Sequence, residues 1–120
     1  MIDHDIIVRI ADIEDTHCAH LITAEMEESA KARGTGIAKR SPEYIANKMK
    51  EGKAVIALTS KGEWVGFCYI ESWSHGAFVA NSGLIVKPEY RKSGVAKSIK
   101  KKIFERSREL FPQSKIFGLT

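Results

Sequence analysis

The stretch that most constrains the fold is residues 84–97, where an apolar strand, a proline and a glycine-containing loop lead into a helix. Leu84-Ile85-Val86 is typical of a buried strand. Pro88 ends that strand, because proline has no N–H for the ladder and holds the preceding residue extended. From Ser93 to Leu110 apolar residues recur at three- and four-residue steps, which predicts a long helix. The fold must therefore place the start of this helix beside the end of a strand.

The start of this helix has the composition of an anion-binding site. Several backbone N–H groups at a helix start lack an intrahelical partner, and they lie at the positive end of the helix dipole. Arg91, Lys92 and Lys97 add full positive charges around them. Gly94 has no Cβ and Ala96 is small, so an oxygen atom can approach the backbone closely. The loop therefore predicts a pyrophosphate group as its ligand.

Charge is distributed unevenly along the chain. The net charge is +4 over 120 residues. Residues 87–120 contain ten Lys and Arg against three Asp and Glu, a net +7, whereas residues 1–86 carry a net −3. The basic third predicts an anionic partner, which is a phosphorylated ligand, a nucleic acid or an acidic protein.

The remainder of the chain predicts alternating strands and helices in one domain over residues 1–120. A first helix begins with Asp15 or Thr16 as its N-cap, and a second begins at Ser41. The residues expected on the buried stripe of the first helix are Cys18, Leu21, Ile22, Met26 and Ala30. The predicted strands are 6–10, 54–59, 64–70, 77–86 and 115–120, and Gly83 inside the fourth indicates a bulge or a close backbone approach. The order β-α-α-β-β-β-α-β predicts an α/β or α+β domain with a mostly antiparallel sheet.

Composition and spacing argue against several other classes. With 43% hydrophobic and 28% charged residues, the chain is not of a disordered or low-complexity type. No apolar run approaches the roughly 20 residues of a membrane span, and the first residues lack the pattern of a signal peptide. Cys18 and Cys68 have neither zinc nor redox spacing, which predicts reduced thiols in the cytoplasm. His17, His20 and Glu25 spread around a helix, so we expect no metal site.

The loop also carries a family motif. Arg91-x-x-Gly94-x-Ala96, preceded by Val86-x-Pro88-x-Tyr90, resembles the acetyl-CoA signature of the GNAT family of N-acetyltransferases, which is Q/R-x-x-G-x-G/A after a strand ending in V-x-P. Val8-Arg9-Ile10-Ala11 with Asp15, and Gly66-Phe67 in the third strand, extend the resemblance over nearly the whole chain. It implies the GNAT-like acyl-CoA N-acyltransferase fold, a twisted, mostly antiparallel sheet flanked by helices.

The resemblance implies acetyl-CoA as acyl donor and a set of residues that hold it. The backbone groups of Ile85 and Val86 would pair with the pantetheine arm as with another strand. The pyrophosphate would be held mostly by backbone N–H groups of Arg91, Lys92, Ser93, Gly94, Val95, Ala96 and Lys97. Ser98, one turn into the helix, either adds a hydroxyl or is a surface serine.

The resemblance further implies direct transfer, in which an amine attacks the thioester and a backbone N–H of the fourth strand stabilises the oxyanion. Glu71 is the candidate general base and His75 the second candidate, and for both the alternative is an ordinary solvated side chain. Where some family members carry a catalytic Glu, the fourth strand offers only Asn81 and Ser82.

The acceptor pocket of the family includes the loop between the first two helices. Here Arg33, Lys39 and Arg40 in that loop suit an acceptor carboxylate, which predicts a small acidic or amino-acid-like amine, with solvated loop charges as the alternative. Family members continue past the fifth strand and supply a tyrosine acid there. The given chain is thus expected to be truncated after the fifth strand, and we expect either self-association through the edge of that strand or further residues missing from the sequence.

The sequence thus predicts a cytoplasmic N-acetyltransferase that acts on a small-molecule amine in a ternary complex. The alternative is a noncatalytic CoA-binding or protein-interaction module. We expect no membrane partner. Nucleic-acid binding through the basic helix is disfavoured, because few aromatic residues interleave its lysines and acetyl-CoA already accounts for the charge.

Overall fold

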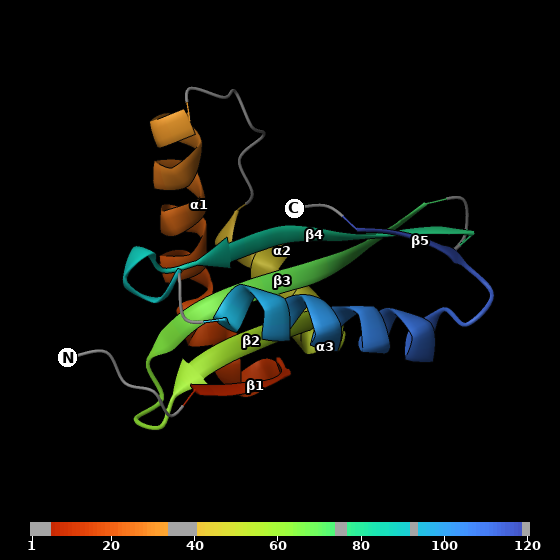
Figure 1. Ribbon diagram of the computed structural model, residues 1–120, viewed down its shortest axis with the longest axis horizontal. Coiled ribbons are helices and arrows are strands. Elements are labelled where there is room, and N and C mark those ends of the chain that lie inside the picture. Colours follow the sequence, from red (N-terminus) through yellow and green to blue (C-terminus); the bar gives the residue numbers. More distant parts are fainter. Residues whose placement is uncertain (1–5, 34–40, 74–76, 92–93, 119–120) are drawn as a thin grey trace.

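A five-stranded sheet in the order β1-β2-β3-β4-β5 forms the centre of the computed structural model, which describes residues 6–33, 41–73, 77–91 and 94–118 (Figure 1). The strands are β1 (Ile6–Ile10), β2 (Ala54–Thr59), β3 (Trp64–Trp73), β4 (Phe78–Val86) and β5 (Lys115–Gly118). Neighbouring strands from β1 to β4 pair antiparallel, and β5 pairs parallel to β4. The predicted mostly antiparallel α/β sheet is confirmed.

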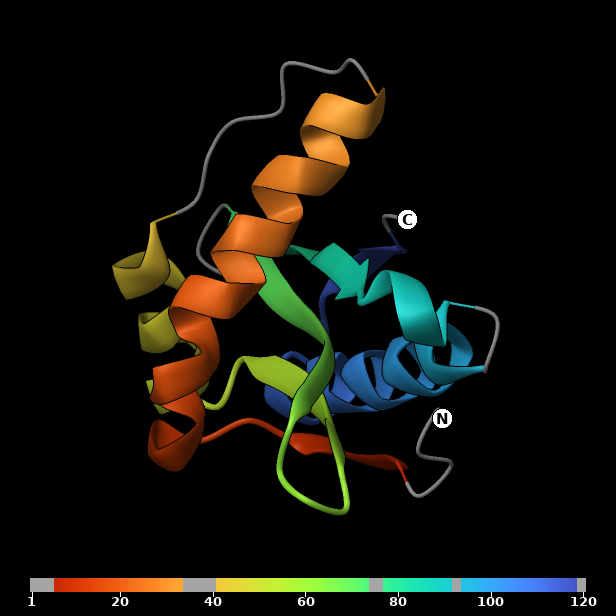
Figure 2. The ribbon, with the colours of Figure 1, turned by 90° about the vertical axis from the view of Figure 1, so that its left-hand side faces the viewer.

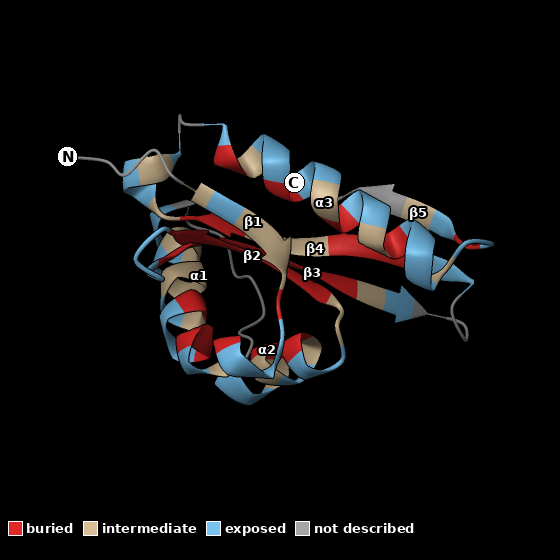
Figure 3. Cartoon of the chain, turned by 90° about the horizontal axis from the view of Figure 1, so that it is seen from below, coloured by how far each residue is buried: buried red, intermediate tan, exposed pale blue. Residues whose placement is uncertain are grey.

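Helices cover both faces of the sheet, as Figure 3 shows. The α helices are α1 (Ala19–Arg33), α2 (Pro42–Lys50) and α3 (Val95–Leu110). In the view of Figure 2, α1 and α2 lie together on one side and α3 lies across the other. Two short 3₁₀ helices, η1 (Ile13–Cys18) and η3 (Pro88–Tyr90), precede α1 and α3.

Each face has its own hydrophobic core. Between the sheet and the α1/α2 pair, Ile22 and Ile45 pack with Phe67 and Tyr69 of β3. On the α3 face, the cluster includes Val55, Val65, Ile70, Val79, Ile99 and Ile103. Because successive side chains of a strand alternate between faces, Tyr69 and Glu71 both belong to the α1/α2 face.

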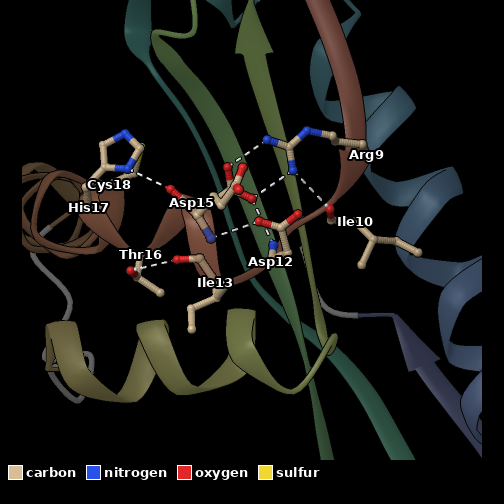
Figure 4. A network of polar contacts seen from close by, with 9 residues as sticks. Arg9, Ile10, Asp12, Ile13, Asp15, Thr16, His17 and Cys18 are labelled. Carbon is tan, nitrogen blue, oxygen red and sulfur yellow. Dashed lines mark hydrogen bonds and ion pairs between the residues drawn. The ribbon is translucent and has the colours of Figure 1, made fainter.

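The first helical segment begins earlier than predicted. Its N-cap is Asp12, whose side chain accepts a hydrogen bond from the backbone N–H of Glu14 (2.9 Å), and not Asp15 or Thr16. Asp15 instead accepts from the N–H of Asp12 (2.8 Å) and holds Arg9 of β1 through two 2.7 Å contacts (Figure 4). Asp15 is thus the third helical residue and completes a capping box with Asp12, while its carboxylate also pairs with Arg9.

Leu21 was predicted to be buried and is 47% exposed. Of the other residues of the predicted stripe, Cys18 and Ile22 are buried and Met26 and Ala30 are half-buried. Leu21 lies about 100° around the helix from Ile22, and α1 buries only a narrow stripe. The prediction for α2 is confirmed: Ser41 Oγ accepts from the N–H of Tyr44 (3.1 Å).

Candidate active site

Among the described residues, β5 pairs with only the first part of β4. This pairing runs from Phe78 with Lys115 to Asn81 with Gly118, and β4 continues to Val86. At that end the N–H of Lys87 donates to Val65 O of β3 (2.8 Å). Because backbone groups alternate along an antiparallel strand, those of Ile85 also face β3, and those of Val86 face away from it. Val86 is thus the better placed of the two for strand-like pairing with a ligand.

A bulge bends β4 where it leaves β5. Gly83 has a φ of +66°, and the register of β4 against β3 shifts between Phe67 and Tyr69. A Cβ on Gly83 would lie 2.1 Å from Cε1 of Tyr69, so only glycine fits. The bulge and the close approach predicted from Gly83 are both confirmed.

The start of α3 is open to an anion. Gly94, its N-cap, has a left-handed φ of +85°, and a Cβ placed on it would meet no atom within 4 Å. Among the described residues, no side chain caps this end and no acidic residue lies in the first turn. The first-turn N–H groups of a helix and the positive end of its dipole are groups that suit a phosphate.

The residues predicted to hold a pyrophosphate are arranged around this opening. Val95 is buried and anchors the first turn, Ala96 is half-buried, and Lys97 and Ser98 are exposed. Two others, Lys92 and Ser93, lie outside the described residues.

Arg91 ties the loop to α1. Its Nε donates to Val86 O (3.1 Å) and a terminal nitrogen donates to Ser29 Oγ (3.3 Å), while the same nitrogen lies 3.6 Å from Glu25 Oε2. The side chain is still 48% exposed. Sequence reasoning missed Glu25 and Ser29 in this role, because no local pattern links them to a residue more than sixty positions away.

Glu71 lies inside β3, since that strand extends to Trp73, and its carboxylate faces a lysine. Lys48 Nζ, from α2, lies 3.7 Å from Glu71 Oε2, and the two side chains are 13% and 20% exposed. The sequence offered no signal for this pair. Glu71 is therefore a half-buried, charge-paired carboxylate at the α1/α2 face.

Asn81 belongs to the opposite face. Its Oδ1 accepts a 2.7 Å hydrogen bond from Ser107 Oγ of α3, and both residues are buried. Ser82 is half-buried, and its carbonyl accepts from the Cys68 thiol (3.2 Å). Burial raises the pKa of Cys68 to about 12, so this thiol stays protonated at neutral pH.

The remaining predicted residues are only partly placed. Arg33 is the last residue of α1. His75, Lys39 and Arg40 lie outside the described residues. Within the described ranges, no cluster of three or more His, Cys, Asp or Glu side chains is arranged for a metal ion. No helix in those ranges combines the length and apolarity needed to cross a membrane.

Comparisons with solved structures confirm the fold. The chain is similar to N-acetylglutamate synthase from Neisseria gonorrhoeae complexed with coenzyme A and N-acetyl-glutamate, with a TM-score of 0.74, 19% identity and coverage of 96% of this chain and 25% of that chain. It is similar to diaminobutyrate acetyltransferase from Paenibacillus lautus in complex with L-2,4-diaminobutyric acid and coenzyme A (TM-score 0.65, 15% identity, coverage 82% and 56%). A protein from Clostridium acetobutylicum with acetyl-CoA, described as a predicted acetyltransferase, has a TM-score of 0.67, 15% identity and coverage of 96% and 80%.

The chain thus spans about a quarter of the first of these proteins and little more than half of the second. No curated protein matches the chain by sequence. The family model described as "Acetyltransferase (GNAT) family" matches residues 24–117, which extend from within α1 to within β5 and include α2, β2, β3, β4, the bulge and α3 with the loop before it. Because that match covers most of the chain, the protein belongs to the GNAT family of acetyltransferases.

Proposed function

We propose that this chain transfers an acetyl group from acetyl-CoA to the primary amine of a small, amino-acid-like molecule, by direct attack in a ternary complex. The observation that carries the proposal is the start of α3, where no described side chain caps the helix, next to the part of β4 that no described residue of β5 pairs with. Family membership supports the same reaction class.

The residues present fit acetyl-CoA. The open space at Gly94 and the free first-turn N–H groups suit a pyrophosphate, and the outward backbone of Val86 suits an extended amide-bearing arm. When bound, acetyl-CoA supplies the activated acyl thioester. The residues proposed to hold it are Ile85, Val86, Arg91, Lys92, Ser93, Gly94, Val95, Ala96, Lys97 and Ser98.

The remaining chemistry falls to β4 and β3. N–H groups on the outer edge of β4, beyond the Gly83 bulge, are the proposed donors to the developing oxyanion. Glu71 is the proposed general base that takes the proton of the acceptor amine, and His75 is the second candidate. Asn81 is not proposed for this role, because it bonds Ser107 on the α3 face.

The acceptor is proposed to carry a carboxylate beside its amine. Arg33, Lys39 and Arg40 supply cations in and next to the segment between α1 and α2, and a guanidinium binds a carboxylate through two parallel hydrogen bonds. Two of the similar structures are described with amino-acid ligands, N-acetyl-glutamate and L-2,4-diaminobutyric acid. This supports an amino acid or an acidic amine as acceptor class.

Two measurements on the same chain test the proposal. Calorimetric titration with acetyl-CoA measures donor binding, and release of the CoA thiol measures transfer to L-glutamate and L-2,4-diaminobutyric acid. The matched control acceptors are propylamine and 1,3-diaminopropane, which correspond to the two amino acids without any carboxylate. We expect transfer to the amino acids to exceed transfer to their controls.

Each other outcome has a defined meaning. Binding of acetyl-CoA without transfer to any amine would favour the noncatalytic CoA-binding module. Absence of acetyl-CoA binding would overturn the proposal. Equal transfer with and without the α-carboxylate would remove Arg33, Lys39 and Arg40 from the acceptor site.

Location and assembly stay predictions. Cys18 and Cys68 are free, buried thiols, which supports a reducing compartment such as the cytoplasm. Self-association through the edge of β5 is likewise a prediction, and light scattering on the purified chain would test it.

A further inference from the structure

Lys48 reaches from α2 to the edge of β3. Its Nζ donates a 2.8 Å hydrogen bond to Ile70 O, while the N–H of Ile70 donates to Lys53 O (2.9 Å). Ladder pairing of β2 with β3 begins at Ala54 opposite Tyr69. The Lys48 ammonium therefore binds the Ile70 carbonyl just beyond the end of the ladder between β2 and β3.

The surroundings of this ammonium are largely apolar. The Lys48 side chain is 13% exposed, and its Nζ lies 5.5 Å and 5.9 Å from the ring centroids of Tyr44 and Tyr69, which contact each other edge-to-face. An ammonium this far removed from water requires a counter-charge. Glu71, 3.7 Å away, provides it.

The pair is continuous with the bend in β4. The ring of Tyr69 that flanks Lys48 also lies against Gly83, close enough to exclude any Cβ there. Glu71 follows Tyr69 by two residues and so shares its face of the sheet. The Lys48–Glu71 pair is thereby connected through one aromatic ring to the segment of β4 proposed to bind the acyl donor.

We propose that Lys48 is a positioning residue for the transfer reaction, which holds the Glu71 carboxylate in place and in its charged form for the acceptor amine. This inference rests on the proposed function, in which Glu71 is the general base. Only the ionised carboxylate can accept a proton, and an ammonium within 4 Å favours that ionised form.

The described groups against this pair come from three elements. Lys48 and Tyr44 approach from α2, Tyr69 lies on β3 itself, and the residue opposite Glu71 on β4 is Ala80. Lys48 is the cation of this set, so a neutral residue in its place changes the charge next to the Glu71 carboxylate.

The variants separate charge from hydrogen bonding. Lys48→Gln keeps a donor for Ile70 O and removes the charge, Lys48→Met removes both, and Lys48→Arg keeps both. Lys50→Gln, at an exposed position on the same helix, is the control. Should Lys48→Gln fail to fold, as thermal denaturation would show, Lys48→Met serves as the second neutral variant, since its unbranched side chain fills the same apolar surroundings.

Two measurements report the ionisation of Glu71, one directly by NMR and one through the rate of acetyl transfer. Carbon-13 NMR of the glutamate carboxyl groups, assigned with Glu71→Gln, gives its titration midpoint without any substrate. The second is the pH profile of kcat/KM, measured with acetyl-CoA and the best acceptor of the panel. The acid limb of this profile reports the pH below which the general base is protonated. In the neutral variants we expect both to move to higher pH by about 0.5 to 1 unit, whereas Lys48→Arg and Lys50→Gln leave both in place.

The two readouts distinguish the possible failures. A midpoint that does not move in the neutral variants overturns the charge-holding role of Lys48. A midpoint that moves without a matching shift of the acid limb overturns the role in catalysis and leaves Lys48 as a purely structural residue. A parent chain that transfers no acetyl group overturns the proposed function, and the catalytic part of this inference with it, while the NMR titration still decides whether Lys48 holds the charge of Glu71.

Discussion

The guanidinium of Arg91 lies 3.6 Å from the carboxylate of Glu25, which joins the loop before α3 to α1. The same guanidinium donates to Ser29 Oγ and to Val86 O. Arg91 belongs to the loop proposed to hold a pyrophosphate, so a bound phosphate and Glu25 would compete for one cation. The position of α1 and the binding of the acyl donor are therefore coupled through Arg91.

Replacing Glu25 with Gln should tighten binding of acetyl-CoA. The variant removes the competing anion, and because an exposed ion pair contributes at most about 1 kcal/mol, the gain should not exceed about fivefold in Kd. Calorimetric titration measures it, with Glu28→Gln, an exposed position on the same helix, as the control. Weaker binding in Glu25→Gln would show instead that the ion pair chiefly holds the loop in its binding conformation.

Gly94→Asp should weaken acetyl-CoA binding at least tenfold more than Gly94→Asn. Both side chains have the same size and tolerate the left-handed backbone at φ +85°, so both variants carry a similar strain of about 1 kcal/mol. Only Asp adds a negative charge at the helix start, where it opposes a phosphate. Calorimetry gives the two affinities and thermal denaturation checks that the two folds are equally stable. Equal affinities would contradict the assignment of this loop to the pyrophosphate.

The Arg9–Asp15 pair should make stability depend on pH in the acid range. Burial alone raises the pKa of Asp15, but the hydrogen bonds from Arg9 and from the Asp12 N–H outweigh it and hold the pKa below 3.8. A carboxyl group whose pKa is lowered by folding stabilises the fold at every pH above its pKa in the unfolded chain. This contribution is lost as the pH falls through its pKa in the folded protein.

Urea unfolding of the parent and of Asp15→Asn between pH 7 and pH 2.5 tests that dependence. Asp15→Asn should be less stable at pH 7 by about 1 to 3 kcal/mol, and the difference should shrink below about pH 3.8. Glu14→Gln, at an exposed position in the same turn, should unfold like the parent. A difference between parent and Asp15→Asn that stays constant with pH would exclude the ionised pair as its source.

Ser107→Ala should destabilise the domain although it removes only one hydroxyl. The loss leaves Asn81 Oδ1 buried without its 2.7 Å donor, which costs about 1 to 3 kcal/mol. In a domain of this size each kcal/mol lowers Tm by about 4 to 8 °C. Thermal denaturation measures the change, and Ser98→Ala, exposed on the same helix, should leave Tm unchanged. A Ser107→Ala variant as stable as the parent would mean that water reaches Asn81.

Local features of the fold were predictable because their causes lie within a few residues. Ser41 caps α2 as predicted, since capping needs a particular side chain at one position. Gly83 pointed to a bulge for the same reason. The helix predicted from Ser93 begins instead at Val95, after the left-handed backbone of Gly94. The charged loop from Arg91 to Lys97 stood out because its residues are consecutive, so the start of α3 could be proposed as an anion site from the sequence.

Local patterns were wrong where a distant partner changed the outcome. Asp15 has the residue type of an N-cap, yet it pairs with Arg9 of β1, and Asp12 caps the helix instead. Leu21 fits a helical stripe, yet no sheet or helix covers its side of α1 well enough to bury it, and it is 47% exposed.

The sequence by itself therefore determined the elements, their order, the family and the loop at the start of α3, because each depends on residues that are close along the chain. Only the tertiary structure decided which polar groups meet across elements. Glu71 and Lys48 belong to β3 and α2, and Asn81 and Ser107 to β4 and α3. Such pairs form when packing of a sheet between two helical layers brings distant side chains within about 4 Å, and no periodicity in the sequence encodes that distance.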